Sequence, residues 1–303
     1  MLATRRGYSQ NFQHRVEGHL AMLLFSLIVA GSFSFGKTIA NDIDPVALTA
    51  VRFVLAAAIL GVFLGASGRI RTVDYKQPWR FFVLGGLFLF YFVLMFEALK
   101  TAAPVSISAI FTIMPLAAAL LDRIIFRCTT TWLIWVALLI GAVGALWVVF
   151  RGSWAALTSL SVGYGEVLFF IATMLHAIYA VLLPKLRRDE PVYATTLGVS
   201  SAAALMLVVL FWPRVSTTNW VDVALYAWVV LLYLAVLATL GTFALITVAA
   251  ARLPSAKVTA YTFLTPFWVV LIESILGNGL PAAFVLFGGV PIAAALFLLF
   301  VER

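Results

Sequence analysis

Apolar runs of roughly 20 residues recur along the whole chain, and this is the length that an α-helix needs to cross the hydrocarbon core of a bilayer. Each run is continuous, whereas the strands of a membrane barrel would be about 10 residues long and would alternate in polarity. The ten runs lie at about residues 20–40, 46–65, 81–99, 105–121, 132–150, 163–183, 193–212, 221–251, 258–276 and 282–301. They predict an all-α membrane protein with ten transmembrane helices.

The composition agrees with this prediction and excludes a soluble globule. Hydrophobic residues make up 64% of the 303 residues and charged residues only 11%, and the mean hydropathy is +1.10. A soluble chain of this length could not bury so much apolar surface in one core. With a single cysteine, the chain has no cysteine cluster for zinc or iron–sulfur ligation, and we expect no metal site and no cofactor.

The positions of the basic residues predict the orientation of the helices. If residues 1–18 form a cytoplasmic N-terminal tail, fifteen of the 20 Lys and Arg residues lie on the cytoplasmic side and four lie outside. Such an excess is typical of cytoplasmic loops. We therefore expect a multi-pass protein of the inner membrane with both termini in the cytoplasm, and the net charge of +8 requires no nucleic acid partner.

Two pairs of segments match between the halves of the chain, each pair at its own offset, which indicates an internal repeat. At an offset of 151 residues, Pro115 falls on Pro266, and at an offset of 146 residues Pro45 falls on Pro191. The repeats would span 19–150 and 163–301, with five helices each. Because five is odd, the second repeat would be inverted in the membrane. Inverted repeats around a central cavity are typical of transporters that work by alternating access.

The same segments carry a family resemblance over about residues 19–301. The stretches AGSFSFGK (30–37) and LTAVRFVLAA (48–57), together with the paired A-L-x-x-x-A…P segments, resemble the EamA type of the drug/metabolite transporter superfamily, in particular its aromatic amino acid exporters. The resemblance implies an exporter of amino acids, metabolites or toxic compounds whose first, third, fourth, sixth, eighth and ninth helices border a cavity. The family's Leu-Gly-Glu after the helix-four and helix-nine prolines is absent here, so no role of that glutamate is carried over.

One polar helix face is the first candidate for the cavity wall. His176 lies near the middle of the sixth run, and Thr173 and Tyr179 lie three residues to either side, so all three share a face. A polar side chain this deep in a span usually faces the bundle interior or a watery cavity. The alternative is a neutral histidine that packs against a neighbouring helix.

Other side chains would complete a wall of aromatic, thioether and hydroxyl groups, although such residues also serve as plain packing. These candidates are Tyr91, Met95, Phe111, Thr239, Thr242, Tyr261 and Thr262.

A third group of residues is expected to act at bends and ends of the helices. Pro115 and Pro266 remove a backbone hydrogen bond inside a span and mark hinges or static kinks. Lys37 and Lys257 lie at opposite helix ends, where they would attract a carboxylate or extend to the membrane interface. For Arg52 we expect a structural ion pair with a loop acid such as Asp42 or Asp44, with substrate binding as the alternative.

No Asp or Glu lies at the centre of any run, so coupling through a buried carboxylate is disfavoured. We therefore expect facilitated export of a neutral or zwitterionic small molecule by a monomer in the lipid bilayer. Amino acids, including aromatic ones, are the expected substrates. A multidrug or toxic-compound exporter is the nearest alternative, and an integral membrane enzyme acting on lipid is the alternative from another class.

Overall fold

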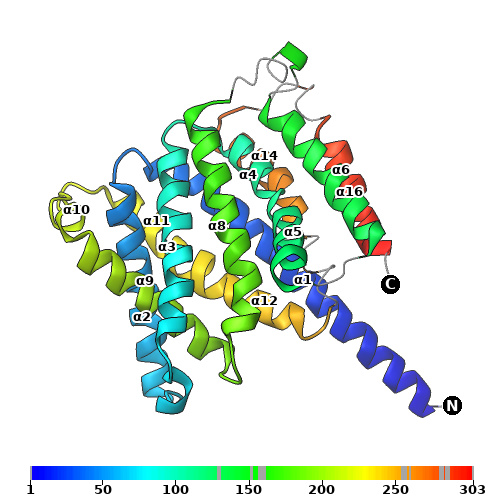
Figure 1. Cartoon of the computed structure of the whole chain (residues 1–303), viewed down its shortest axis with the longest axis horizontal. Coiled ribbons are helices and arrows are strands. Elements are labelled where there is room, and N and C mark those ends of the chain that lie inside the picture. The colour runs from blue at the N-terminus through cyan, green and yellow to red at the C-terminus, as the bar shows by residue number, and fades with distance from the viewer. Residues whose placement is uncertain are drawn as a thin grey trace.

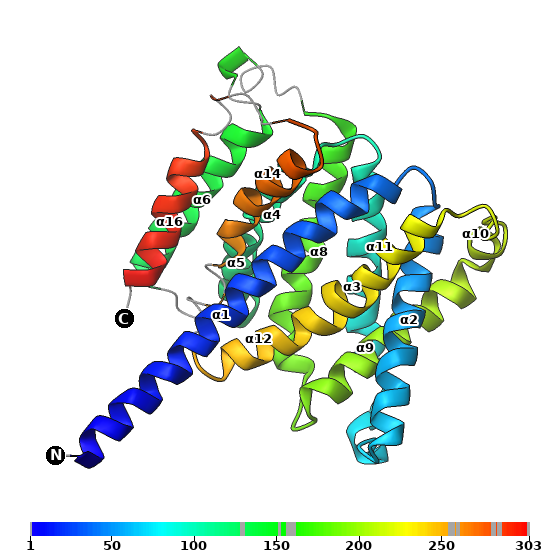
Figure 2. The same cartoon turned by 180° about the vertical axis from the view of Figure 1, so that it is seen from behind.

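The computed structural model describes residues 2–127, 131–150, 153–155, 162–253, 258, 261–279, 283 and 287–301, and all regular elements in these residues are helices. In chain order they are α1 (Leu2–Ile39), α2 (Pro45–Ala66), η1 (Thr72–Tyr75), α3 (Trp79–Leu99), α4 (Pro104–Phe111), α5 (Met114–Phe126), α6 (Trp132–Val149), α8 (Tyr164–Leu186), α9 (Val192–Leu210), α10 (Trp212–Ser216), α11 (Leu225–Ala235), η2 (Val236–Gly241), α12 (Thr242–Ala250), η3 (Tyr261–Leu264), α14 (Thr265–Ile275) and α16 (Gly289–Val301). Figures 1 and 2 show them as one bundle.

Seven helical segments of the described residues are long and apolar enough to cross a membrane. They are formed by α1 from Val16 onward, α2, α3, α4 with α5, α8, α9, and α11 through α12. Two shorter apolar helices, Trp132–Val148 and Tyr261–Ile275, accompany them. The prediction of an all-helical membrane protein is confirmed, and the described residues provide seven helices of full membrane length where the sequence predicts ten.

The first helix is longer than its apolar run. It begins at Leu2 and ends at Ile39, so the backbone of the expected N-terminal tail continues the helix without a break. Figure 2 shows this part of α1 projecting from the bundle.

Side chains and prolines fix where several helices begin. Asp44 precedes α2, and its Oδ1 accepts hydrogen bonds from the backbone N of Val46 (2.9 Å) and of Ala47 (3.3 Å). Pro45 occupies the first turn, where the missing N–H costs nothing. Pro191 stands at the matching position before α9.

The two matched prolines coincide with interruptions of the helical path. The chain is α-helical up to Phe111 and again from Met114, and Pro115 lies in the first turn of the new segment. In the second half, η3 gives way to α14 at Thr265, with Pro266 in its first turn. Because proline has no N–H, it ends the regular hydrogen-bond pattern of the preceding turn.

A further interruption has no proline. Residues Val236–Gly241 between α11 and α12 form a π-helix, in which the backbone hydrogen bonds reach one residue further than in an α-helix. The apolar run 221–251 gave no sign of this widening.

Helices from the two halves of the chain pack directly against each other. Helix α3 packs against α8 and α9, and α6 packs against α16, as the neighbouring ribbons in Figures 1 and 2 show. A buried ion pair adds to this contact: Arg80 Nη1 lies 2.9 Å from Glu190 Oε1, and the two side chains are only 4% and 3% exposed. The same Nη1 donates to the carbonyl of Leu186 at 2.5 Å. The beginning of α3 is thus tied to the end of α8.

Gly85 allows the close approach of α3 and α9. A Cβ atom there would lie 3.0 Å from both the backbone N of Ala203 and the backbone O of Val199, whereas one at the adjacent Gly86 would meet only Met206 Cε at 3.4 Å. Backbone atoms cannot move aside as the end of a flexible side chain can.

We therefore expect Gly85→Ala to destabilise the protein and Gly86→Ala to leave it as stable as the wild type or slightly more so. Overpacking costs about 1–3 kcal/mol, and both changes gain the same roughly 0.5–1 kcal/mol of helix preference. The melting temperatures of the two detergent-solubilised variants check this. Equal melting temperatures would show that α3 and α9 do not need this close contact.

Candidate functional site

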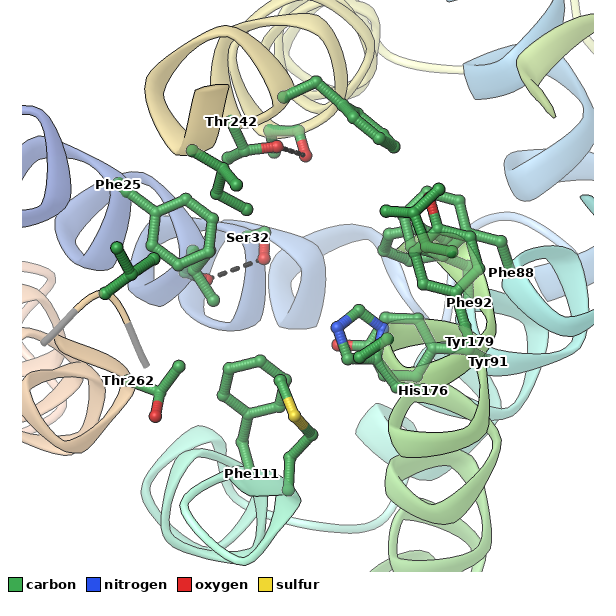
Figure 3. A pocket seen from close by; sticks show the side chains of 18 of the residues that line it. Phe25, Ser32, Phe88, Tyr91, Phe92, Phe111, His176, Tyr179, Thr242 and Thr262 are labelled. Atoms are coloured by element: carbon green, nitrogen blue, oxygen red, sulfur yellow. Dashed lines mark hydrogen bonds between the residues drawn. The ribbon is translucent and has the colours of Figure 1, made fainter. Parts of the chain in front are cut away.

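A cavity of about 270 Å³ lies inside the bundle, with side chains from α1, α2, α3, α4, α8 and α12 in its wall. Its volume is close to the lower end of the ~300–1,000 Å³ typical of small-molecule sites. Figure 3 shows Phe25 and Ser32 on one side, Phe111 below, Thr242 above, and His176, Tyr179 and Tyr91 opposite, all around one space.

Six of the residues singled out in the sequence are brought together in this wall. They are Tyr91, Phe111, His176, Tyr179, Thr242 and Thr262. They come from α3, α4, α8, α12 and η3, which are far apart in the sequence.

The other candidates lie elsewhere. Thr173 is buried, and its hydroxyl donates to the carbonyl of Phe169 at 2.9 Å. Met95 is fully buried in the main hydrophobic core. Tyr261 Oη lies 2.9 Å from His19 Nδ1 on α1. Thr239 lies behind the wall and bonds to two of its residues: its hydroxyl accepts from Arg52 at 2.9 Å, and its carbonyl accepts from the hydroxyl of Thr242 at 3.0 Å.

Sequence reasoning did not select several other wall residues. These are Met22, Phe25, Val29, Ser32, Arg52, Phe88, Phe92, Met114, Ala180, Leu183, Ala238, Phe243, Ile246 and Val258. Most are apolar residues within apolar runs, so nothing in their type or spacing separates them from residues that face lipid. Ser32 and Arg52 carried the available signal, as polar residues inside the first and second runs.

Aromatic rings surround His176. The imidazole centroid is 4.5 Å from the ring of Tyr91, 5.7 Å from Phe111 and 5.8 Å from Tyr179. Phe88 stacks on Tyr179 with a centroid separation of 4.6 Å and an interplanar angle of 11°. This part of the wall offers flat apolar faces and ring edges.

The expectation for Arg52 is wrong. Its side chain is fully buried rather than paired with a loop acid, and it lies in the cavity wall. Asp44 instead pairs with Arg214 at 2.5 Å, and Asp42 accepts a hydrogen bond from Tyr226. The acids lie just before the start of α2, whereas Arg52 lies two turns inside it and points into the bundle.

Three buried polar atoms of the wall have no hydrogen-bond partner among the described residues. They are Nη1 of Arg52, Nδ1 of His176 and Oη of Tyr179. A buried polar atom without a partner costs about 1–3 kcal/mol, and such atoms are uncommon in native proteins. A polar ligand in the cavity would supply partners for them.

The cavity lies toward one end of the bundle. Its wall includes Met22 and Phe25 from the first part of α1, Leu183 from the end of α8 and Ile246 from the end of α12. At the opposite end the rings of Phe33, Phe111 and Phe169 fill the space, with Phe33 5.6 Å from each of the other two centroids.

Lys37 closes the same filled end. Its Nζ donates to the carbonyl oxygens of Leu99 (2.6 Å) and Lys100 (3.2 Å), where α3 ends and its carbonyl groups lack partners within the helix. It therefore joins the ends of α1 and α3. Its expected counterpart Lys257 lies outside the described residues.

The described residues contain no group of three or more His, Cys, Asp or Glu side chains that could hold a metal ion. The polar groups in the wall are instead a histidine, an arginine, tyrosines and hydroxyls. These groups bind organic molecules through hydrogen bonds and ring contacts.

The whole chain is similar to known transporters. An uncharacterized transporter of Bacillus subtilis, YyaM, is 30% identical over 206 residues, which cover 66% of this chain and 68% of the relative. An uncharacterized transporter of Archaeoglobus fulgidus is 27% identical over 287 residues, which cover 92% and 96% of the two chains.

A solved crystal structure has the same fold, with a TM-score of 0.66 over 94% of this chain and 96% of its own, at 19% identity. The pattern of the EamA-like transporter family matches residues 16–150 and 163–301. The chain therefore belongs to the EamA-like transporter family, as the resemblance in its sequence predicts, and is a multi-pass membrane transporter.

Proposed function

We propose that the protein exports amino acids, both aromatic and other neutral ones, across the inner membrane by facilitated diffusion with alternating access. One observation carries the proposal: a cavity inside the bundle combines flat aromatic faces with buried polar atoms that have no hydrogen-bond partner in the described ranges of the chain. A molecule with an apolar group and a small polar head would complement both parts of this wall.

The aromatic faces suit two parts of such a substrate. An aromatic or aliphatic side chain would pack on the rings of Phe88, Tyr91 and Phe111, which line the cavity. An ammonium group is attracted to the electron-rich face of an aromatic ring. The wall has no clustered cations to bind a nucleotide or phosphate, since Arg52 is the one Lys or Arg among its described residues.

The end toward which the cavity lies supports entry of substrate from the cytoplasm. That end carries the exposed Arg69 and Arg71 after α2 and the exposed Arg187 and Arg188 after α8. Basic residues of short loops are typical of the cytoplasmic side. In this proposal both termini are cytoplasmic, and substrate enters the cavity from the cytoplasm.

The two halves of the chain would exchange conformations during the cycle. Residues 19–150 and 163–301 would form two inverted repeats of five spans each, with the two shorter apolar helices and α16 completing ten. The helices after the two interruptions start at equivalent positions: α5 starts at Met114 and α14 at Thr265, 151 residues apart. Pro115 and Pro266 lie in their first turns. A helix without its regular hydrogen bonds bends there more easily than elsewhere.

Counterflow in liposomes tests the substrate. Liposomes that contain the purified protein and unlabelled phenylalanine should accumulate labelled phenylalanine without any ion gradient. We expect His176→Phe, which retains a ring but removes the nitrogens, to slow this by about fivefold, the effect of one lost hydrogen bond of ~1 kcal/mol.

The matched control is Thr196→Ala on α9, which removes another buried polar group; that hydroxyl donates to the carbonyl of Val192 at 2.9 Å. Its rate should equal that of the wild type. Absence of counterflow with phenylalanine, tryptophan, threonine and methionine, together with uptake of cationic drugs, would reject amino acid export in favour of toxic-compound export.

Transport should not depend on a proton gradient. The described residues of the wall include no Asp or Glu, the side chains that usually carry a coupled proton. An imposed pH difference across the liposome membrane should therefore leave the final accumulation ratio of phenylalanine at one when no counter-substrate is present. Concentrative uptake that collapses with a protonophore would show coupling and would direct attention to His176.

Lys37 should hold the filled end of the bundle closed. The test uses a chain with Ser32→Cys in a Cys128→Ser background, labelled by a membrane-impermeant maleimide from the side where α1 ends. We expect Lys37→Met to raise the labelling rate severalfold. Ser32 lines the cavity, so labelling from that side requires the end to open.

Lys100→Met is the control for this experiment. Lys100 lies at the same end, but its Nζ pairs with Glu97 of its own helix at 3.0 Å. Equal labelling rates in both variants would mean that the bond between α1 and α3 does not govern opening.

A further inference from the structure

The guanidinium of Arg52 is held from one side only. Its Nε donates to Thr239 Oγ1 at 2.9 Å, and its Nη2 donates to the carbonyl of Ala238 at 3.1 Å. Its Nη1 is buried and has no hydrogen-bond partner in the part of the chain that the structure describes. The side chain is 0% exposed, so water does not solvate the remaining N–H groups.

The π-helix creates the acceptors that hold Arg52. The Thr239 hydroxyl donates to the carbonyl of Leu234 at 2.9 Å, five residues back, so its oxygen lone pair is directed at the guanidinium. The carbonyl of Ala238 lies in the same widened turn. The ring of Phe92 covers one face of the guanidinium at 3.7 Å. These contacts fix the orientation of the group without neutralising its charge.

No carboxylate of the described residues pairs with Arg52. The described acids that form ion pairs do so with other partners: Asp44 with Arg214, Glu190 with Arg80, Glu97 with Lys100, Asp74 with Arg71 and Glu17 with Arg252. Glu273, which is also buried, accepts from Asn278. A buried charge without a counter-charge is costly, because water no longer solvates it.

The second repeat has no equivalent cation. The position that matches Arg52 at the offset of 146 residues is Gly198, and a Cβ atom there would lie 2.8 Å from the ring of Phe81. Packing between α9 and α3 therefore excludes a long side chain at that position. The cavity has a single positive group on one side rather than a symmetric pair.

We propose that Arg52 is the carboxylate anchor of the cavity and thereby restricts the substrates to molecules with one carboxylate. A carboxylate would accept from Nη1 and supply the missing counter-charge. The rings of Tyr91 and Phe88 in the same wall would then contact the apolar part of the same molecule. This inference rests on the proposed carrier function, and it adds that an amide or an amine of the same shape is rejected.

Ligand-induced stabilisation tests the anchor without any transport. The melting temperature of the purified protein would be measured in a methanesulfonate buffer, which contains neither chloride nor a carboxylate, with phenylalanine, phenylacetate, phenylalaninamide or phenethylamine. A ligand raises the melting temperature if it binds the folded state. We expect phenylalanine and phenylacetate to do so, and the amide and the amine to bind at least about tenfold more weakly, since a hydrogen bond to a charged group contributes roughly 1.5–3 kcal/mol.

Two variants of Arg52 and one control keep the test decisive. Arg52→Gln should abolish the difference between phenylacetate and phenethylamine. Arg52→Lys retains the charge and serves as the test if the Gln variant does not fold. It should bind phenylacetate more weakly than the wild type but still prefer phenylacetate over phenethylamine. Arg214→Gln, which removes a surface arginine paired with Asp44, should behave as the wild type.

The outcomes separate this inference from the proposed function. Stabilisation by phenylacetate that depends on Arg52, without phenylalanine counterflow, would support the anchor and reject amino acid transport. Counterflow of phenylalanine that phenylalaninamide inhibits equally well, unchanged in Arg52→Lys, would reject the anchor and support transport. Stabilisation by chloride that equals that by phenylacetate would assign Arg52 to an inorganic anion and overturn its role toward substrate.

Discussion

The hydrocarbon core of a membrane offers no hydrogen bonds, so each backbone N–H and C=O group in it must find its partner within the protein. This constraint explains why the described residues are built from helices, and it gives meaning to the places where helices are irregular. The breaks after Phe111 and after Leu264 and the π-helix at Val236–Gly241 all adjoin the cavity, where Phe111, Thr262 and Ala238 contribute to the wall. Irregular backbone is tolerated where it is buried in protein or lines a cavity.

The π-helix shows how such an irregularity provides hydrogen-bond acceptors for a buried side chain. In a regular α-helix the carbonyl groups near Ala238 would be used within the helix, and a guanidinium would find few acceptors. The widened turn directs the Thr239 hydroxyl and the Ala238 carbonyl at Arg52. A cation can thus be buried among aromatic rings with its orientation fixed by neutral acceptors, and its charge remains available to a ligand.

The contacts between the halves are unevenly distributed along the bundle. Toward the end where the cavity lies, a buried ion pair joins Arg80 at the start of α3 to Glu190. At the filled end, the ring of Phe33 packs on that of Phe169 from the other half. An ion pair also joins Asp44 to Arg214 there, but its side chains are 29% and 50% exposed. Lys37 adds a contact within the first half, between α1 and the last carbonyl groups of α3. Because an exposed ion pair contributes less than a buried one loses when it is broken, charged contacts hold the filled end less strongly if the bundle rearranges.

The sequence by itself determined that the protein lies in a membrane, that it is all-helical, and where the two interruptions at proline fall. The length and hydropathy of an apolar run and the missing N–H of proline act locally, so they can be read from the sequence. It also identified the face that carries His176 and Tyr179, since a polar residue deep in an apolar run has few other places to point. Only the tertiary structure decided which neighbours complete the site. Thr173 shares that face but bonds to its own helix, Tyr261 bonds to α1, and Arg52 binds a π-helix 186 and 187 residues away along the chain rather than the nearby acids. These choices depend on how helices distant in sequence pack together, and apolar wall residues such as Phe25 and Phe88 carry no local sign of which neighbour they will face.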